Sequence, residues 1–186
     1  MKYIPHVRRK NQRLKNFDYS LNGYYFVTIC TQNRNNYFGD FTKNQMNVNG
    51  AGRMVESIWN EIPIFYAGVD VDQFIVMPNH CHGIIILNNV GATPCGCPDT
   101  QLGQARGPAP TNNRFSLSDI VHRFKSLTTA RYRYGVRHNG WHPFQGRLWQ
   151  RNYYDRIIRN DSELNRIRKY IIENPINWSF DKENLN

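Results

Sequence analysis

Two histidines one residue apart are the first side chains in this chain that could do chemistry. The stretch FIVMPNHCHGIIIL (residues 74–87) predicts a buried strand, a short turn and a second buried strand that begins with His80 and His82. Because strand side chains alternate between faces, both imidazoles lie on one face of a stiff strand. That arrangement suits two ligands of one metal ion. It fits equally well two histidines hydrogen-bonded in a partly buried site.

A helix near the C-terminus offers the groups that could complete such a site. It is predicted over ELNRIRKYIIEN and ends before Pro175. Tyr170 and Asn174 are four residues apart and share one helix face, with Glu173 beside them. If this helix packs over the sheet end that holds the histidines, the amide of Asn174 is a third ligand. Tyr170 then stands beside the metal, which a phenol needs in order to attack a phosphodiester at neutral pH.

A second pair of tyrosines competes for the role of nucleophile. Tyr153 and Tyr154 lie in an aromatic, basic segment. Their partners one helical turn later would be Ile157 and Ile158, which cannot bind a metal. We therefore favour Tyr170 over Tyr154 and interpret the pair as framework or base-stacking residues.

The charge balance points to a polyanionic partner. Lys and Arg number 24 against 14 Asp and Glu, a net charge of +10, and aromatic residues make up 13% of the chain. Basic and aromatic side chains together suit single-stranded nucleic acid, although a merely solvated basic surface has the same composition. The residues predicted to hold the phosphate backbone are Arg123, Lys125, Arg147 and Arg151.

The pattern of apolar residues predicts an α+β fold. The elements expected in order are a strand at Gly23–Gln32, a helix at Asn49–Ile62, strands at Val69–Met77 and His80–Leu87, a helix opened by Ser116, a strand at Arg147–Ile158 and the final helix. This order is the ferredoxin-like (RRM-like) βαββαβ pattern of an antiparallel sheet, with an added C-terminal helix that carries the tyrosine. The histidine strand is then expected in the middle of the sheet.

The length of 186 residues predicts one domain. We expect a basic N-terminal arm at 1–20, a single domain at 21–178 with a mobile inserted loop at 89–115, and a short tail at 179–186. No apolar run has the length of a membrane span, and the N-terminus lacks the apolar segment of a secretory signal. A cytoplasmic protein without membrane contact is the expectation.

Several motifs in order resemble the REP-associated tyrosine transposases, a branch of the HUH endonucleases, which are named for histidine–hydrophobic–histidine. The motifs are RLKNFDYS, GYYFVTICTQNR, MPNHCHGIIIL, the FKS of 124–126, WQRNYYDRIIRN and YIIENP. The resemblance covers most of the chain, roughly residues 8 to 178. One departure is Cys81, which is smaller than the usual bulky residue between the histidines but faces away from the metal.

The resemblance implies a function and a role for each residue. His80, His82 and Asn174 would bind a divalent metal, Mg²⁺ or Mn²⁺, although two imidazoles alone favour softer ions such as zinc. Tyr170 would form a 5′-phosphotyrosine and release a 3′-hydroxyl. The implied partner is single-stranded DNA with hairpin-forming, REP-like repeats, and the implied state is a monomer or a homodimer.

Two other functions fit the same residues. The first is a non-catalytic module that binds nucleic acid through its sheet, basic residues and aromatic rings. The second is a hydrolase that uses zinc at the histidine pair without a covalent step. A covalent protein–DNA adduct distinguishes the transposase-like enzyme from both.

Overall fold

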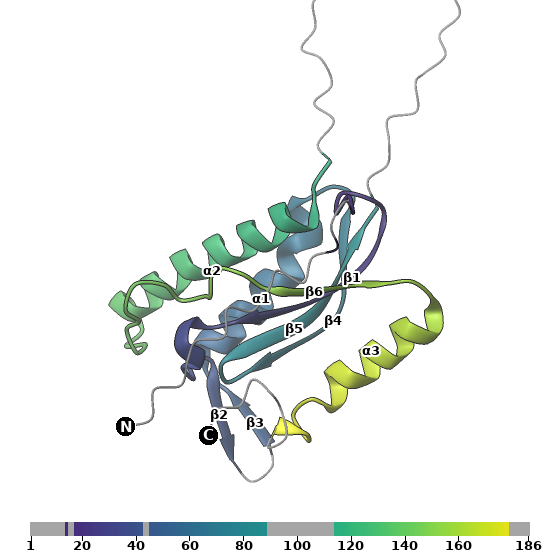
Figure 1. Cartoon of the computed structure of the whole chain (residues 1–186). Helices are drawn as coiled ribbons and strands as arrows, with labels where there is room; N and C mark the ends of the chain where they lie inside the picture. Colours follow the sequence, from purple (N-terminus) through teal and green to yellow (C-terminus); the bar gives the residue numbers. More distant parts are fainter. Residues whose placement is uncertain (1–13, 15–16, 43–44, 89–113, 179–186) are drawn as a thin grey trace, which may run out of the picture.

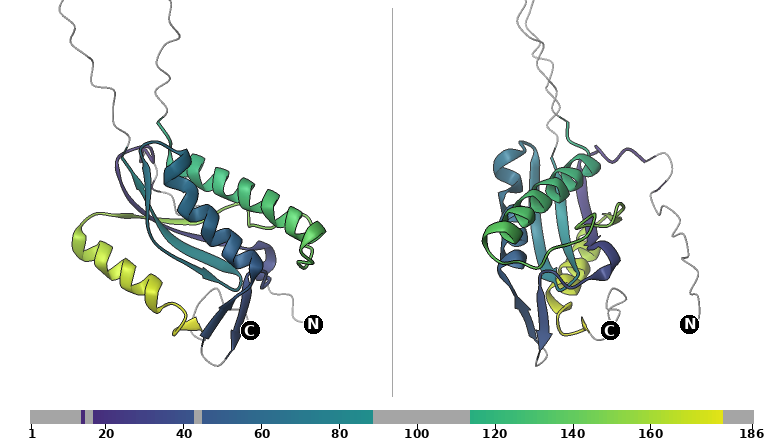
Figure 2. Two further views of the ribbon diagram at one scale, coloured as in Figure 1. Left: turned by 180° about the vertical axis from the view of Figure 1, so that it is seen from behind. Right: turned by 90° about the vertical axis from the view of Figure 1, so that its left-hand side faces the viewer.

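A four-stranded antiparallel sheet forms the centre of the computed structural model, which describes residues 14, 17–42, 45–88 and 114–178. The strand order is β4 (Val69–Met77), β5 (His80–Leu87), β1 (Gly23–Cys30) and β6 (Tyr154–Ile158). Helices α1 (Gly50–Phe65) and α2 (Leu117–His138) cover one face, and α3 (Asp161–Glu173) covers the other (Figures 1 and 2). The predicted α+β, ferredoxin-like architecture with an added C-terminal helix is confirmed, and β5 is a central strand as expected.

Alternation along β5 divides the core into two layers. Cys81, Ile85 and Leu87 point into the larger cluster beneath α1 and α2. Ile84 points the other way, into a smaller cluster with Ile158, Leu164, Ile167 and Ile171 beneath α3. Because His80 and His82 share the phase of Ile84, both imidazoles emerge on the α3 side.

Cys81 therefore faces away from the histidine side, as predicted, and is buried. Burial raises the pKa of its thiol, because the charged thiolate would lose its hydration. The residue acts as a small apolar side chain in the larger core.

Local signals in the sequence start the helices where they were predicted. Asn49 caps α1 by accepting a hydrogen bond from the Gly52 N–H at 2.9 Å. Ser116 and Asp119 form a capping box at the start of α2.

The prediction that α1 stops before Pro63 was wrong by one turn. The helix continues to Phe65 with Pro63 inside it. Proline removes a single backbone donor, and here that donor belongs to the last turn, where the loss is small. The Tyr66 N–H still bonds to the Ile62 carbonyl and closes the helix.

The prediction of a strand over Arg147–Ile158 was correct only for its second half. Residues 147–153 make one isolated bridge, between Trp149 and Thr31, before β6 begins at Tyr154. The ammonium of Lys125, on α2, donates hydrogen bonds to three consecutive carbonyl oxygens of this segment, those of residues 150 to 152, at N···O distances of 3.0–3.4 Å. Carbonyls turned toward α2 cannot continue the sheet ladder.

A small separate hairpin follows the first strand. It consists of β2 (Gly39–Thr42) and β3 (Gln45–Val48), after the short 3₁₀ turn η1 (Gln32–Arg34).

Most of the predicted arm at 1–20, nearly all of the loop at 89–115 and the tail at 179–186 lie outside the described residues. No helix in the described part of the chain has the length and apolar character needed to cross a membrane.

Candidate active site

The two histidines at the start of β5 bring their Nε2 atoms to 3.0 Å from each other. His80 is 0% exposed and His82 is 2% exposed. β5 pairs with β4 on one side and β1 on the other, so the strand that carries both rings is fixed along both edges. The imidazoles are thereby held side by side in a buried, rigid position.

The outer nitrogen of each ring has a partner of its own. His80 Nδ1 lies 2.8 Å from Asn79 Oδ1, and the Asn79 amide nitrogen donates to the Arg34 carbonyl at 3.2 Å. The amide oxygen must therefore accept from His80, which places the proton of the neutral ring on Nδ1. Nε2 of His80 consequently presents a lone pair.

His82 is held by a hydroxyl group, which can either donate or accept a hydrogen bond. Its Nδ1 lies 2.8 Å from the hydroxyl of Thr28, which is its direct cross-strand partner on β1. A hydroxyl both donates and accepts, so it supports either tautomer of His82. When Nδ1–H donates to Thr28, Nε2 of His82 also presents a lone pair toward His80.

This donor set fits a divalent metal. Neutral imidazoles with outer N–H groups fixed by protein oxygens are the usual form of metal-binding histidines. Two ligands at ~2.1 Å from one ion and at right angles are ~3.0 Å apart, the spacing of neighbouring octahedral ligands. Among the described residues no group of three His, Cys, Asp or Glu side chains gathers to hold an ion.

The hydroxyl of Tyr170 reaches this pair, 3.4 Å from Nε2 of His82. Its ring packs edge-on against Phe26 at 6.0 Å, and Phe26 in turn stacks on His82 at 5.5 Å. Tyr170 is nevertheless 47% exposed. The phenol is thus oriented by Phe26 and His82 while one side remains open to solvent.

Asn174 caps α3 one turn beyond Tyr170, and its side chain is buried, with 2% exposed. The chain continues to Trp178, whose indole stacks on His80 at 5.8 Å. Asn174 therefore lies between a residue that contacts His82 and one that contacts His80. Its predicted role as third metal ligand stays a prediction.

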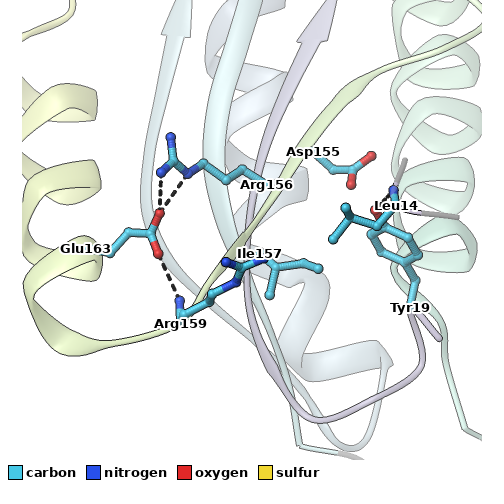
Figure 3. Close-up of a pocket in the computed structure, with 7 residues that line it drawn as sticks. All are labelled: Leu14, Tyr19, Asp155, Arg156, Ile157, Arg159 and Glu163. Atoms are coloured by element: carbon cyan, nitrogen blue, oxygen red, sulfur yellow. Dashed lines mark hydrogen bonds and ion pairs between the residues drawn. The ribbon is translucent and has the colours of Figure 1, made fainter. Parts of the chain in front are cut away.

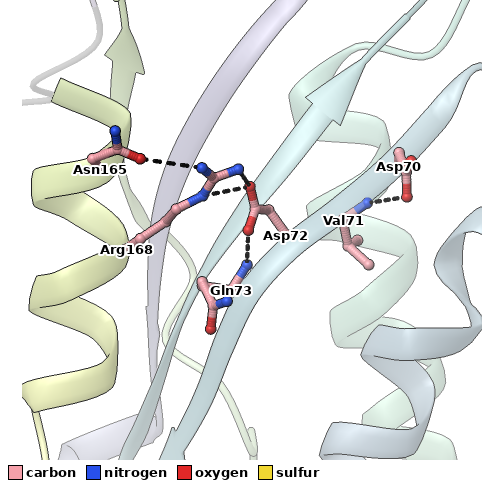
Figure 4. A network of polar contacts seen from close by, with 6 residues as sticks. All are labelled: Asp70, Val71, Asp72, Gln73, Asn165 and Arg168. Carbon is pink, nitrogen blue, oxygen red and sulfur yellow. Dashed lines mark hydrogen bonds and ion pairs between the residues drawn. The ribbon is translucent and has the colours of Figure 1, made fainter. Parts of the chain in front are cut away.

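An ion pair fixes the rotation of α3 two residues before the tyrosine. Arg168 donates through Nε and Nη2 to Oδ2 of Asp72 on β4, with the Nε distance 2.9 Å (Figure 4). Asp72 lies in a β-bulge, because β4 uses three residues to advance from Val71 to Phe74 where the paired strand β5 uses only two. The extra residue aims the carboxylate at α3.

The start of α3 is tied to the opposite edge of the sheet. Glu163 forms an ion pair with Arg156 of β6 and accepts from the Arg159 backbone N–H at 3.0 Å (Figure 3). These hydrogen bonds, together with the nearby arginine charges, lower the pKa of the Glu163 carboxyl. A pocket of about 210 Å³ borders this pair, and the Arg156–Glu163 ion pair that lines it anchors the helix.

Tyr154, the rival nucleophile, lies in the same row of the sheet as His82. Thr28 pairs with His82 on one side and with Tyr154 on the other. Two strand spacings separate Tyr154 from His82, ~10 Å, whereas Tyr170 is in near contact. The geometry favours Tyr170 as the tyrosine beside the histidines.

Two of the four basic residues predicted to hold DNA lie in a layer away from the histidines. Arg123 and Lys125 belong to α2, in the layer on the far side of the sheet from α3. Arg123 packs over Tyr66 and Phe115, and Lys125 bonds to loop carbonyls. Arg147 and Arg151 are exposed in the segment before β6. Lys125 thus has a structural role that its sequence position did not indicate.

Sequence reasoning missed the residues that hold the histidines and the helix, namely Thr28, Asn79, Trp178, Asp72 and Arg168. Asn79 had a signal, since it directly precedes His80. The partners of Thr28, Trp178 and Asp72 are far away in sequence, and only strand register and helix docking bring them together.

The fold and this site define the class of protein: an α+β domain with a histidine pair on the central strand and a tyrosine helix docked against it. Comparison with a solved structure agrees with the fold of this class. A REP-associated tyrosine transposase bound to a REP hairpin superposes with a TM-score of 0.55, covering 91% of this chain and 76% of that one, at 16% identity. The fold that the sequence resemblance predicted is confirmed. A candidate transposase from Deinococcus radiodurans is more distant, with a TM-score of 0.46, 18% identity and coverage of 88% and 97%.

A relative in sequence extends over nearly the whole chain. An uncharacterised protein of Haemophilus influenzae is 38% identical over 178 residues, 94% of this chain and 92% of the relative. The chain therefore belongs to the same family as the Haemophilus influenzae protein. No protein-family model matches the chain.

Proposed function

We propose that this protein is a metal-dependent endonuclease and strand transferase that acts on hairpin-containing, REP-type single-stranded DNA through Tyr170. The observation that carries the proposal is the 3.4 Å approach of the Tyr170 hydroxyl to Nε2 of His82, beside two Nε2 atoms 3.0 Å apart. The shared fold with a transposase bound to a REP hairpin supports the same class of substrate.

His80, His82 and Asn174 would hold the metal, Mg²⁺ or Mn²⁺. When bound, the ion supplies positive charge that polarises the scissile phosphate and stabilises the charge that develops on it. The chain's own residues provide the rest. Thr28 and Asn79 hold the imidazoles, and Phe26 orients the phenol.

In the covalent step the phenolic oxygen of Tyr170 forms a bond to phosphorus and the bond from phosphorus to the 3′-oxygen breaks. The phenolic proton leaves to solvent, which reaches this half-exposed side chain, and the departing 3′-oxygen takes a proton from solvent. The products are a 5′-phosphotyrosine and a free 3′-hydroxyl. Because the phosphotyrosine keeps the phosphodiester energy, attack by a 3′-hydroxyl can reseal the strand, which is strand transfer.

The test uses 3′-labelled single strands that carry a hairpin between randomised tails, incubated with Mn²⁺ or Mg²⁺ and run on a denaturing gel. The wild type is expected to retain label as a protein adduct, and a 5′-labelled strand is expected to shorten. Tyr170→Phe should lose the adduct, and the matched control Tyr154→Phe should keep it.

Other outcomes identify the alternatives. An adduct that persists in Tyr170→Phe and disappears in Tyr154→Phe refutes the assignment of the nucleophile. Cleavage with zinc and no adduct in any variant supports a zinc hydrolase. Binding without cleavage supports a non-catalytic nucleic-acid-binding module.

The cis arrangement of the site supports action as a monomer. Tyr170 reaches His82 of its own chain, so no second copy is needed to bring nucleophile and histidines together. Mixing Tyr170→Phe with His80→Ala chains should then give no adduct. Restored adduct in the mixture would show that a homodimer exchanges its tyrosine helices.

A further inference from the structure

The stretch from residue 120 to residue 154 carries much of the excess positive charge of the molecule. It contains seven Lys and Arg residues and no Asp or Glu, whereas the whole chain has a net charge of +10. Five of the seven belong to α2, which covers the face of the sheet opposite α3 (Figure 2). The seven are Arg123, Lys125, Arg131, Arg133, Arg137, Arg147 and Arg151.

Three of these arginines form a stripe along the outer face of α2. Arg123, Ser126, Ala130, Arg133 and Arg137 are all exposed. They follow one another at steps of three or four residues, so they share one face of the helix. At ~1.5 Å per residue this α2 stripe is ~21 Å long. The helix therefore presents three cations along a straight line, with only small side chains between them.

Two of the three guanidinium groups are held by aromatic rings. The Cζ atom of Arg123 lies 5.2 Å from the ring centroids of both Tyr66 and Phe115. That of Arg133 lies 5.7 Å from the ring of Phe144. A ring restricts the motion of an arginine but, unlike a carboxylate, leaves its positive charge uncompensated. A cation that is already held in place loses less conformational freedom when an anion binds.

The cations on the opposite side of the sheet have carboxylate partners. Arg156 and Arg166 form ion pairs with Glu163, and Arg168 forms one with Asp72. Their charge is thus largely compensated within the protein, and they serve to anchor α3.

The α2 stripe has no such compensation. Within the described part of the chain, no carboxylate forms an ion pair with its three arginines. The one acidic residue of α2, Asp119, accepts hydrogen bonds from Ser116 in the capping box. Arg133 and Arg137 are four residues apart, and like charges at this spacing destabilise a helix. A polyanion bound along the stripe relieves this repulsion.

We propose that the α2 stripe binds the duplex stem of the DNA hairpin, an inference that rests on the proposed function. A double helix is rigid and carries one charge per ~1.7 Å of its axis, so the stripe faces roughly twelve phosphate charges. Single strands bind largely by stacking on aromatic side chains, and the stripe contains none. The stem then lies on the face of the sheet opposite Tyr170, and the single-stranded tail passes the sheet edge to reach the tyrosine.

The experiment measures binding to the stem alone, separately from cleavage. The full-length protein is titrated without metal against a fluorescein-labelled hairpin that has a stem of about ten base pairs and no tails. A (dT)24 strand with a similar number of phosphates is the single-stranded probe. Fluorescence anisotropy gives the affinity at salt concentrations from about 50 to 200 mM, and each phosphate contact adds ~0.9 to the slope of log affinity against log salt.

One variant combines Arg123→Gln, Arg133→Gln and Arg137→Gln. Glutamine keeps the helix preference of arginine, and folding is checked by thermal unfolding. The slope for the tailless hairpin should become less steep by ~2.7, whereas the slope for (dT)24 should stay the same. The rise from 50 to 200 mM salt then weakens hairpin binding about 40-fold less in the variant than in the wild type.

A matched control removes the same number of charges from exposed positions at or just before α3, and it should keep the wild-type slope for the hairpin. The control substitutions are Arg159→Gln, Arg166→Gln and Lys169→Gln.

The outcomes separate this site from the nuclease. An unchanged hairpin slope in the folded stripe variant, or an equal change in the control, overturns the stem site and leaves the nuclease to the adduct assay. An equal loss of slope for (dT)24 shows a single-strand site and also overturns the stem. A flatter hairpin slope in a protein that forms no adduct supports the stem site and refutes the nuclease.

Discussion

Replacing Thr28 by valine tests whether the histidine pair is a metal site. Valine has nearly the shape of threonine and the same β-branching, so β1 keeps its packing and its strand preference. The change removes only the hydroxyl that lies 2.8 Å from Nδ1 of His82 in a position 5% exposed. Any effect on metal binding therefore reports on the support of one imidazole.

The expected magnitude follows from the tautomer that a metal requires. A bound ion needs the lone pair of His82 Nε2, so the proton stays on Nδ1 and, in the variant, is buried without the Thr28 acceptor. Leaving such a donor unsatisfied costs about 1–3 kcal/mol. At ~1.4 kcal/mol per factor of ten this is about a 5- to 150-fold loss of affinity, in agreement with the 10- to 100-fold effect typical of residues that support metal ligands.

The assay measures Mn²⁺ affinity directly, without DNA, from the concentration of free Mn²⁺ determined by electron paramagnetic resonance. Thr28→Ser is the matched control, because it keeps the hydroxyl and is expected to bind within about threefold of the wild type. The rate of adduct formation should fall in parallel in the valine variant at subsaturating Mn²⁺. If folded Thr28→Val binds Mn²⁺ as tightly as the serine variant, the tautomer reasoning is refuted.

Three further predictions concern the frame of the site. Gly83→Ala should destabilise the fold by about 1–3 kcal/mol in chemical denaturation, because its Cβ would meet Trp59 at 2.4 Å; an unchanged midpoint would contradict the packing. Asp72→Asn should cost about 1 kcal/mol or less of stability but slow adduct formation severalfold, because Arg168 no longer fixes α3; equal rates would show that the ion pair does not position the tyrosine. The carboxyl of Glu163 has a lowered pKa, so its contribution to stability is complete above the ordinary carboxyl pKa near 4.3 and is lost as the pH falls through the lower, folded-state pKa. Glu163→Gln should therefore flatten the acid side of the curve of unfolding free energy against pH. Parallel curves for the variant and the wild type would exclude this role.

Much of this molecule is readable from local sequence. The alternation of β5, the caps at Asn49 and Ser116, and the spacing of Tyr170 and Asn174 are properties of neighbouring residues, so they predicted elements, faces and most helix starts. Sequence reasoning was wrong where a contact from elsewhere outweighed the local pattern. The carbonyls bound by Lys125 ended the expected long strand, although its aromatic and β-branched residues favoured a sheet.

The sequence by itself determined that two imidazoles share one face of a strand and that a phenol and an amide share one face of a helix. Tertiary structure alone decided that these faces meet. The register of β1 against β5 places Thr28 opposite His82, and the bulge in β4 turns Asp72 toward Arg168. The periodicity of a segment fixes which way its side chains point, but not which distant segment they meet, because that depends on pairing and packing across the whole domain.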